Sequence, residues 1–524
     1  MDKTIIVGAG LGGLTTGIML KKARPDDEVV IYDANKHPGG FCNAYQKAVT
    51  YNNEKIIYTV NIPLITGDFS EGAPFDKLMK YMGVQNINWR AIENFFLYHP
   101  ENDKPFPFTK KGYLDILKLA QNEKEAKKLK KFFDKINSFY NDLMHKAHLP
   151  PTFLQAMKMM FTIPGTVFSL LLDKPYLKTI KKLGIKTKTI QEILCVPEAF
   201  MGVDVDKVSA MGEMCMIQSF LQEHSVQPAG SDTFQTLADN FAKRFEELGG
   251  KLILNTRVDS VEFDGKKAVG VLVGGEVVKS DNVILSVAQD VIKPLIVGGS
   301  EIPKVKSLIK KIDKLQNPNS DYYCYYLIDK KTVDENPVLT EFAYHIYKLP
   351  EGRDATNWKL ALWVPPKVYN DKYYILECVM TEQSQEKINW WIDLRKTDYK
   401  RYTEEKNKMA EKYLEIIKEV EPIFKKNPPI MNVLAYTPAS YIQYGSKYPI
   451  CGIAQTPDNY GMKRMTPKIL SNLFLSSGAV FAGGLWGAVA GGWQGFVAFY
   501  KEVYGIEIGN RDVMYKPDAK NLPE

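Results

Sequence analysis

The N-terminal 40 residues constrain the fold more than any other stretch. An apolar run at 4–7 leads directly into Gly8, Gly10 and Gly13, which have the spacing G-x-G-x-x-G. A segment with helical character follows, and a second apolar run ends in an acid, Asp33, roughly 20 residues past the last glycine. This order predicts a strand, a tight turn, a helix and a second strand, which together form a βαβ dinucleotide-binding unit.

Each of these residue types suits one physical task in such a unit. Gly8 allows the sharp turn out of the strand, Gly10 lets the backbone approach a pyrophosphate, and Gly13 lets the helix pack closely on the sheet. The free N–H groups at the start of the helix then face the phosphates, and Asp33 accepts hydrogen bonds from a ribose. The Gly pair in Pro38-Gly39-Gly40 brings a second backbone segment towards the cofactor, which favours FAD over NAD.

A second Gly-rich segment lies at 472–500. A short strand at 473–475 runs into a Gly-rich loop and then into an Ala/Gly-rich helix. Such a helix presents its N-terminus to a site that the backbone can approach, where it stabilises negative charge on a ring such as reduced flavin.

The segments between these two ends alternate in character. Asn52-Asn53 predicts the turn of a hairpin, and 233–248 predicts a helix that Gly249-Gly250 closes. Strand patterns follow up to residue 286 and indicate a return to the nucleotide domain. Dense aromatic residues over 301–430 predict a sheet and a helical cap around an apolar cavity.

The region 110–190 is largely helical in pattern and rich in Lys. One interpretation is a helical substrate domain with a solvated basic face. The other is a monotopic membrane patch, in which Lys side chains meet anionic lipid while Met, Phe and Leu of 159–172 enter the interface.

Whole-chain properties limit the class of protein. With 524 residues, 45% of them apolar, the chain is expected to form two or more folding units. The net charge of +7 is mild, and we expect no nucleic-acid partner. The six cysteines form no C-x-x-C pair and the six histidines have no metal-ligand spacing, so we expect a reduced cytoplasmic setting and no metal. We expect neither a signal peptide nor a membrane-spanning segment.

Three separated blocks, in this order, resemble one family. They are VGAGLGGL…YDANKHPGGFC, VQPAGSDTFQTLADNFAKRFEELGGKLILNTRVDSVEF…DNVILS and NLFLSSGAVFAGGLWGAVAGG. The chain resembles the phytoene desaturase-like family of FAD-dependent oxidoreductases, a group that includes carotenoid desaturases, carotenoid isomerases and retinol saturases. The form Gly39-Gly40-Phe41-Cys42 is similar to the retinol-saturase-like branch, whereas flavin amine oxidases usually carry GGR there. Two positions depart from the family pattern: Tyr58-Thr59-Val60-Asn61 and Gly230-Ser231.

The resemblance implies a fold and a set of cofactor-binding residues. The fold class is α/β, with a Rossmann-like FAD-binding domain made of three discontinuous segments and an α+β substrate domain with a sheet and a helical cap, as in flavin amine oxidases and the Rab GDP-dissociation inhibitors. The implied boundaries are 1–70, 226–300 and 431–505 for the FAD-binding domain, 71–225 and 301–430 for the substrate domain, and 506–524 for a tail. The implied cofactor-binding residues are Gly8, Gly10, Leu11, Gly12, Gly13, Asp33, Ala34, Gly40, Phe41, Cys42, Val258, Gly478, Ala479, Leu485, Trp486 and Ala488.

The leading functional hypothesis is a flavoenzyme that saturates, desaturates or isomerises carbon–carbon double bonds of a long apolar substrate, such as a polyene, retinoid, isoprenoid or fatty acyl chain. Its partners would be that apolar or lipid substrate and, at the periphery, a membrane. Hydride chemistry belongs to the flavin, so no catalytic side chain is assigned; Cys42 and Asn61 are the polar positions suspected near the ring. A flavin amine oxidase and a non-catalytic lipid-binding protein similar to the GDP-dissociation inhibitors are the alternatives.

Overall fold

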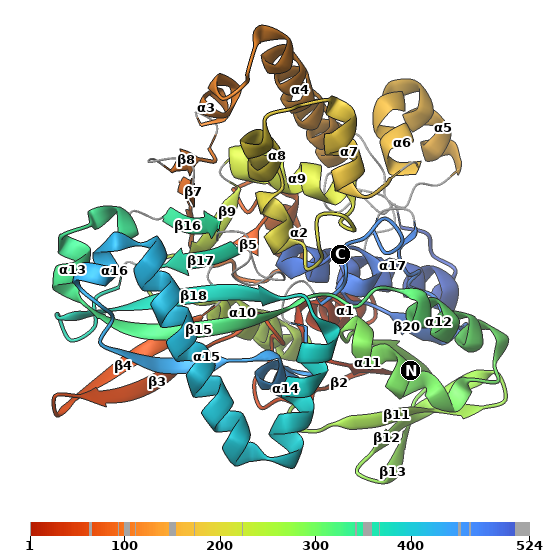
Figure 1. Ribbon diagram of the computed structural model, residues 1–524. Coiled ribbons are helices and arrows are strands. Elements are labelled where there is room, and N and C mark those ends of the chain that lie inside the picture. The colour runs from red at the N-terminus through yellow and green to blue at the C-terminus, as the bar shows by residue number, and fades with distance from the viewer. Residues whose placement is uncertain are drawn as a thin grey trace.

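A parallel five-stranded sheet forms the centre of the nucleotide-binding half of the computed structural model (Figure 1). The structure describes residues 2–61, 65–92, 94–98, 105–109, 112–145, 153–171, 173–222, 224–340, 343–348, 359–365, 367–448, 452–460 and 463–508. The strand order of the sheet is β10-β2-β1-β14-β20. Its strands are β1 (Lys3–Val7), β2 (Glu28–Tyr32), β10 (Lys251–Ile253), β14 (Asn282–Leu285) and β20 (Leu473–Leu475).

Three distant segments of the chain meet in this sheet. Ile6 of β1 pairs in register with Ile284 of β14, and Ile284 pairs on its other side with Phe474 of β20. All of these strands run parallel, so each needs a crossover connection, and both faces of the sheet must be covered.

Alternating side chains of the strands serve two different cores. Ile6, Ile284 and Phe474 pack in one core with the helices α1 (Leu11–Ala23), α10 (Phe234–Glu247) and α17 (Gly484–Tyr504). Their neighbours in the strands, such as Ile5 and Val283, pack on the other side. There they meet the antiparallel sheet β11 (Val258–Asp264), β12 (Lys267–Val273) and β13 (Glu276–Lys279), with α11 (Gln289–Ile296) and α12 (Pro303–Lys314).

A second, seven-stranded sheet forms the floor of the other half, with α14 and α15 across one face (Figure 1). Its strands, in spatial order, are β19 (Met431–Tyr436), β15 (Ser320–Asp329), β18 (Tyr373–Glu382), β17 (Lys359–Trp363), β16 (Ala343–Lys348), β7 (Asn94–Tyr98) and β8 (Phe106–Pro107). The accompanying helices are α13 (Lys330–Asp334), α14 (Gln385–Thr397), α15 (Tyr399–Val420) and α16 (Pro422–Lys426).

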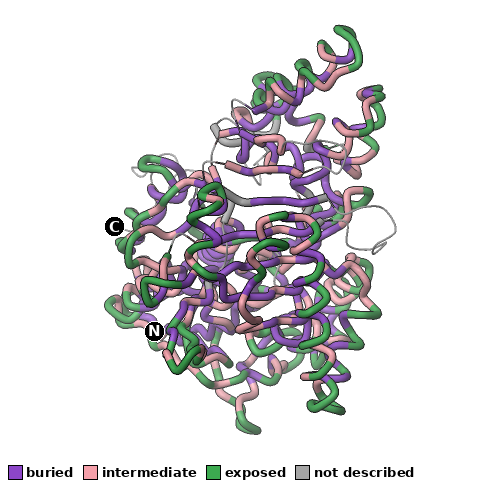
Figure 2. The backbone as a smooth tube through the Cα atoms, turned by 60° about the vertical axis from the view of Figure 1, so that its left-hand side comes forward, coloured by how far each residue is buried: buried purple, intermediate pink, exposed green. Residues whose placement is uncertain are grey.

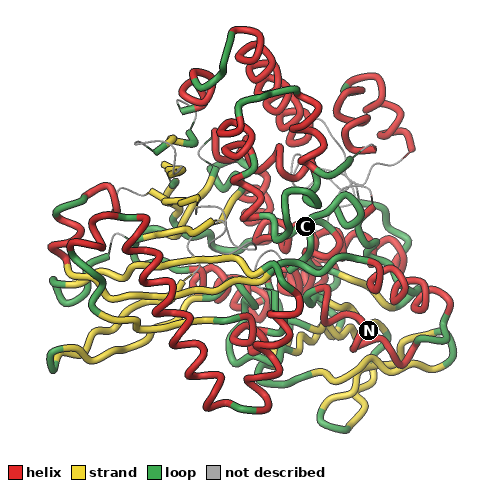
Figure 3. The backbone as a smooth tube through the Cα atoms, viewed as in Figure 1, coloured by secondary structure: helices red, strands yellow, loops and turns green. Residues whose placement is uncertain are grey.

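A helical part stands above this sheet, as the red coils at the top of Figure 3 show. It comprises α3 (Tyr113–Lys118), α4 (Glu123–His145), α5 (Phe153–Thr162), α6 (Pro164–Leu171), α7 (Tyr176–Leu183), α8 (Lys188–Leu194) and α9 (Ala210–Leu221). The remaining elements are α2 (Pro74–Met82), the small sheet of β5 (Ile65–Thr66), β9 (Ser225–Pro228) and β6 (Trp89–Ala91), and the hairpin of β3 (Ala44–Tyr51) and β4 (Glu54–Asn61).

Most of the local predictions are confirmed. Asn52 and Asn53 have φ of 49° and 62°, which is the left-handed pair that a two-residue hairpin turn requires. Thr233 caps α10 with a capping box, and Gly249, at φ 82°, follows the end of that helix. The predicted α/β fold class is therefore confirmed, while the exact residue boundaries of the domains stay a prediction.

Buried backbone runs through the strands in the middle of the molecule, where the two halves meet (Figure 2). No helix in the described part of the chain is long and apolar enough to cross a bilayer.

Candidate cofactor and substrate site

A cavity of about 870 Å³ lies at the carboxyl ends of the parallel strands. The turns after β1, β2, β14 and β20 all contribute to its wall, with Gly8, Asp33, Ser286 and Ser477 among the lining residues. Ligands of open α/β sheets bind at this edge, because the connecting loops leave a crevice there.

The structure brings nearly all of the predicted cofactor-binding residues to this one cavity. The residues that line it are Gly8, Gly10, Leu11, Gly12, Asp33, Ala34, Gly40, Phe41, Cys42, Val258, Gly478, Ala479, Leu485, Trp486 and Ala488. Gly13 lies beneath them, and a Cβ there would collide with the carbonyl oxygen of Gly8. Gly13 thus has the packing role that its place in the motif predicts.

The N-terminus of α1 forms an anion-binding cradle. Gly10 is the N-cap residue, no side chain caps the helix, and its first turn holds no acid. A Cβ on Gly10 would have no protein atom within 4 Å, so the space in front of it is open. The N–H of Gly39 donates to the carbonyl oxygen of Ala9 at 2.8 Å, which brings the second Gly pair beside this turn. Free amides at a positive helix end, without side chains in the way, fit the pyrophosphate of a dinucleotide.

Asp33 is tied to the glycine turn through its side chain. One carboxylate oxygen accepts a hydrogen bond from the Ala9 N–H at 2.7 Å, and the other accepts from the Asn35 N–H at 2.7 Å and from Asn35 Nδ2 at 3.0 Å. Burial raises the pKa of Asp33, while these hydrogen bonds and the charge of Arg257 act in the opposite direction. The carboxylate therefore orders the turn and still lines the cavity.

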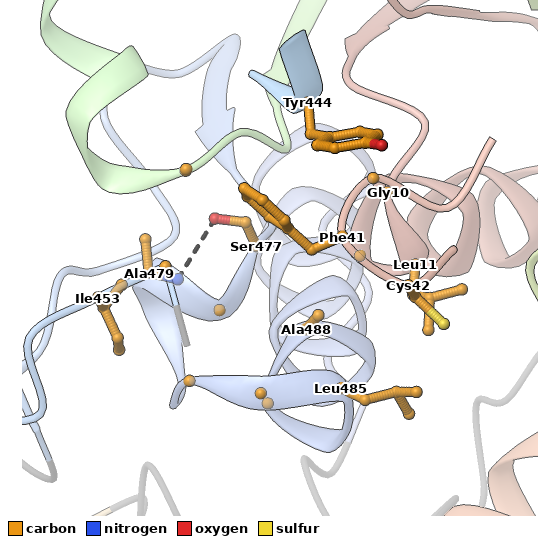
Figure 4. A pocket seen from close by; sticks show the side chains of 18 of the residues that line it. Gly10, Leu11, Phe41, Cys42, Tyr444, Ile453, Ser477, Ala479, Leu485 and Ala488 are labelled. Atoms are coloured by element: carbon orange, nitrogen blue, oxygen red, sulfur yellow. Dashed lines mark hydrogen bonds between the residues drawn. The ribbon is translucent and has the colours of Figure 1, made fainter. Parts of the chain in front are cut away.

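A second helix N-terminus faces the same cavity, as predicted for the C-terminal Gly-rich segment. The α17 helix starts after Gly483 without a side-chain cap and without an acid in its first turn. Just before it, Ser477 Oγ accepts a hydrogen bond from the Ala479 N–H at 3.3 Å (Figure 4). The helices α1 and α17 pack together, and Thr16 Oγ1 donates to the carbonyl oxygen of Gly492 at 2.9 Å. Two positive helix ends thus converge on one cavity.

Two arginines on the cavity wall were not predicted from the sequence. Arg257 precedes Val258 in the chain, and Arg464 lies between the seven-stranded sheet and β20 in sequence. Burial lowers the pKa of Arg464. Guanidinium groups can face the phosphates of a dinucleotide; the position of Arg257, one residue before the strand that carries Val258, was the available signal.

Away from the cradle, the seven-stranded sheet forms the wall of the cavity. Asp321, Tyr323 and Tyr325 of β15 line it, whereas Tyr322 and Cys324 point to α14 and α15 in the opposite core. This follows from the two-residue period of a strand. The sequence predicted an aromatic sheet here but did not identify Asp321, whose spacing from Tyr323 and Tyr325 places it on the same face.

Aromatic rings connect this wall with the cradle. The Phe41 ring lies 6.0 Å from that of Tyr444 and 6.5 Å from that of Tyr441, centroid to centroid, and Tyr436 lies 5.9 Å from Tyr441. The side chains of Phe41 and Tyr444 lie close together beside Gly10 in Figure 4.

Much of the remaining lining at this end is apolar, although Ser219, Thr381 and Gln455 also contribute. The helical part contributes Phe200, Met201, Met211 and Met216, and the sheet contributes Ile346, Ala361 and Val379. Unbranched Met side chains adapt to irregular apolar ligands.

The two polar positions suspected near the ring differ in outcome. Cys42 is 7% exposed, its thiol contacts the carbonyl oxygen of Phe234 at 3.6 Å, and burial raises its pKa far above the usual range. That environment is typical of an inert, structural thiol. The side chain of Asn61 lies outside the described residues.

The family described as flavin containing amine oxidoreductase matches residues 11–323, which is more than half of the chain. The chain belongs to this family. Within the family, a curated relative is the phytoene desaturase (lycopene-forming) of Paracoccus sp. (strain N81106 / MBIC 01143), which is 23% identical over 288 residues, or 53% of each protein. The chain thus matches about half the length of that relative. The predicted resemblance to phytoene desaturase-like flavoproteins is confirmed.

Solved structures show that the fold is that of the flavin amine oxidases. An oxidoreductase from Methanosarcina mazei has a TM-score of 0.60 at 15% identity, covering 95% of this chain and 100% of that one. Putrescine oxidase bound to putrescine has a TM-score of 0.60 at 12% identity, covering 96% and 99%. Cyclohexylamine oxidase from Brevibacterium oxydans IH-35A has a TM-score of 0.56 at 12% identity, with the same coverage.

Family membership and the cradle agree on the cofactor and the general chemistry. The cofactor is FAD, and the protein is an FAD-dependent oxidoreductase of the amine oxidase and phytoene desaturase superfamily. Among the residues that the structure describes, no group of three His, Cys, Asp or Glu side chains could hold a metal ion.

Proposed function

We propose that this oxidoreductase adds, removes or relocates hydrogen at a carbon–carbon double bond of a long apolar substrate. The observation that carries the proposal is the apolar wall of the cavity, built by Met201, Met211 and Met216 on one side and by Ile346 and Val379 on the other. This wall continues from the nucleotide cradle, so that a hydrocarbon chain can lie beside the cofactor without leaving the protein.

We further propose how the chain holds FAD. The α1 N-terminus takes the pyrophosphate, Asp33 the ribose and the Val258 backbone the adenine, while Gly478, Ala479 and 485–488 lie along the flavin. All of these positions line the same cavity, which supports the assignment. When bound, FAD supplies hydride transfer at its ring.

The residues around the ring would then orient the substrate and exclude water. Leu485 is 9% exposed and Tyr441 is 6% exposed, so these side chains are largely shielded from bulk solvent. The uncapped N-terminus of α17 would stabilise negative charge on the ring, because its first residues, Gly484 and Leu485, line the cavity. Phe41, Tyr441 and Tyr444 limit the width of the space next to the cradle.

The test is turnover by the FAD-loaded protein of phytoene and of all-trans-retinol, with products identified by mass spectrometry. Gain, loss or rearrangement of hydrogen at a double bond supports the proposal. Hydrogen peroxide release from putrescine or cyclohexylamine, without any polyene product, would instead show an amine oxidase. Protein that stays colourless after FAD is added would favour the lipid-carrier alternative.

We also propose that the protein meets an anionic membrane surface from the cytoplasm through α5 and α6, which project from the helical part in Figure 1. Five large apolar side chains on these helices face solvent, with exposed fractions of 46% for Met157, 39% for Met160, 83% for Phe161, 52% for Phe168 and 55% for Leu171. Single exposed apolar residues are common, but a contiguous group marks an interaction site.

The opposite face of these helices connects the patch to the cavity. Met159, Ile163 and Val167 belong to the same core as Met201 and Met211, which line the cavity. An apolar substrate that leaves a bilayer near Phe161 would therefore be close to the helical core that also forms one wall of the cavity.

Three basic side chains of the helical part lie near one another. Burial, and then the charges of Lys182 and Lys135, lower the pKa of Lys174, which follows α6 in the chain. A cluster of cations in the same part of the protein as exposed aromatic side chains suits an anionic lipid surface.

Liposome co-sedimentation tests the membrane contact. The wild type should bind vesicles of phosphatidylcholine with phosphatidylglycerol better than phosphatidylcholine alone, and F161D with F168D and L171D should abolish binding. The control is Y399D, because Tyr399 is 64% exposed on α15, far along the chain from the patch. Equal binding by the triple variant and the wild type would refute the contact.

A further inference from the structure

Asp321 places a buried carboxyl group on the cavity wall. The residue is 3% exposed and lines the cavity, and its Oδ1 has no hydrogen-bond partner among the described residues. Thr381 lies directly opposite in the β15–β18 register and also lines the cavity. Buried polar atoms are normally satisfied, so this oxygen is available to something that enters the cavity.

Tyr441 presents a second unsatisfied group to the same space. It lies in the short 3-10 helix Pro438–Tyr444, is 6% exposed and lines the cavity, and its hydroxyl has no hydrogen-bond partner in the described structure. Burial raises the pKa of Tyr441, and a charge on the nearby Asp321 would raise it further. The Tyr441 ring stands 6.5 Å from Phe41, next to the glycine cradle.

The surroundings disfavour the charged form of the Asp321 carboxyl. Burial raises its pKa well above the usual range, and the opposing influence is a hydrogen bond with the Thr381 side chain. Among the residues that the structure describes, no cationic side chain contributes to this balance. A neutral carboxyl group and a phenol can each donate and accept one hydrogen bond, which suits a neutral oxygen more than a cation.

Glu377 shows that the arrangement at Asp321 is distinct. Glu377 is also in the seven-stranded sheet, is 2% exposed and has an unpartnered Oε2, and burial raises its pKa in the same way. It is not among the residues that line the cavity. The two acids share burial and chemistry but differ in access to a ligand.

We propose that Asp321 and Tyr441 form a recognition site for a neutral oxygen-bearing terminus, a hydroxyl or carbonyl group, of the otherwise apolar substrate. This inference rests on the proposed function, because it takes the remainder of the ligand to be a hydrocarbon chain. Thr381 holds the Asp321 carboxyl in place, and the donor and acceptor atoms of Asp321 and Tyr441 pair with the oxygen. The site would thus select an oxygenated substrate over the corresponding hydrocarbon.

Binding of matched ligands to the FAD-loaded full chain tests the site without requiring turnover. The probes are farnesol, farnesene and farnesylamine. They have similar fifteen-carbon isoprenoid chains and end in a hydroxyl group, in the vinyl group of a conjugated diene and in an amine. Affinities are measured from changes in flavin absorbance and in protein fluorescence. The variants are D321L, D321N, Y441F and, as the buried control, E377Q.

We expect the wild type to bind farnesol more tightly than farnesene. The D321L variant should bind farnesol about tenfold or more weakly than the wild type, while its affinity for farnesene should stay within about twofold of the wild-type value. D321N should retain most of the farnesol affinity because an amide still pairs with an oxygen. Y441F should lose part of it, and E377Q should match the wild type.

Three outcomes would overturn the proposal. An equal loss for farnesol and farnesene in D321L would show a merely structural role. Tighter binding of farnesylamine, lost in both D321L and D321N, would show a cation site. Failure of the wild type to bind either farnesene or farnesol would also remove the apolar substrate on which the proposal rests. If the protein still binds farnesol more tightly than farnesene but transfers no hydrogen to or from either, only the proposed redox function would be refuted.

Discussion

The Asp33 carboxylate accepts a hydrogen bond from the backbone N–H of Ala9 at 2.7 Å, so the acid at the end of β2 fixes the glycine turn after β1 from within. The motif is usually interpreted through the ribose that the acid would contact. Here the same carboxylate also satisfies a buried amide between Gly8 and Gly10.

Replacing Asp33 with Asn should lower both FAD retention and thermal stability. The two side-chain oxygens of Asp33 accept hydrogen bonds from the backbone N–H groups of Ala9 and Asn35. In Asn, one of these oxygens is replaced by an NH2 group, which is a donor and cannot accept the hydrogen bond. The expected cost is about 1–3 kcal/mol. The flavin-to-protein ratio after gel filtration and the melting temperature measure the effect. E28Q, at the partly exposed start of the same strand, is the control. Unchanged FAD content in D33N would contradict the prediction.

Gly10→Val and Gly13→Ala should fail in different ways. A side chain on Gly10 enters the open cavity, so G10V should leave the FAD-free protein as stable as the wild type but abolish FAD retention. A Cβ on Gly13 collides with the Gly8 carbonyl oxygen, so G13A should destabilise even the FAD-free protein, by about 1–3 kcal/mol.

Denaturant unfolding with and without FAD separates the two glycine effects. A G10V protein that still purifies yellow would show that the cradle has been misinterpreted. A G13A protein with unchanged stability would refute the packing role.

Glu125 should make the helical part sensitive to acid. Burial tends to raise its pKa, but hydrogen bonds from the N–H groups of Gln121, Thr187 and Lys186 outweigh this and lower the pKa from 4.5 to about 2. A depressed pKa stabilises the fold above pH 4.5, and this stabilisation is lost as the pH falls from 4.5 towards 2.

The control for this pH effect is E125Q. The variant should be less stable than the wild type at pH 7 by about 1–3 kcal/mol, because the amide cannot serve all of these donors. The difference between the two proteins should shrink as the pH falls below 4.5. Urea unfolding at several pH values measures it, and a constant difference would argue against titration of Glu125.

Cys42 should be unreactive in the folded protein. Burial raises the pKa of its thiol, and the thiolate is the form that reacts. Iodoacetamide at pH 8 should leave Cys42 unmodified in the native state and modify it fully in guanidinium chloride, as peptide mass spectrometry can show. Rapid labelling of the native protein would mean that this thiol reaches solvent beside the cradle.

The sequence predicted the cradle well because its determinants are local. Gly8 to Asp33 includes both strands, the turn and the helix of one unit, so spacing alone places Asp33 beside the glycines. The pairing of β14 with β20 is not local and was not predicted; the resemblance to a family implied only that both segments belong to the FAD-binding domain.

The substrate end was harder to predict because both faces of β15 are aromatic. In the run DYYCYYLI, Tyr322 and Tyr326 enter the core under α15, while Tyr323 and Tyr325 line the cavity. The hydrophobic pattern is the same on both faces, so it does not indicate which face meets a ligand. Only the packing of α14 and α15 on one side decides this, and with it the direction of Asp321.

The order of the strands in the nucleotide-binding sheet also has a consequence for biosynthesis. Strand β1 lies between β2 and β14, and β14 cannot gain its outer neighbour β20 until residues 473–475 leave the ribosome. At about 5–20 residues per second, this final strand follows β1 by roughly 20–90 s. For the last part of that interval, roughly 10–40 s after its own synthesis, β14 would expose an unpaired edge at the cofactor site, so we expect the FAD site to be complete only once residues 473–475 have joined the sheet.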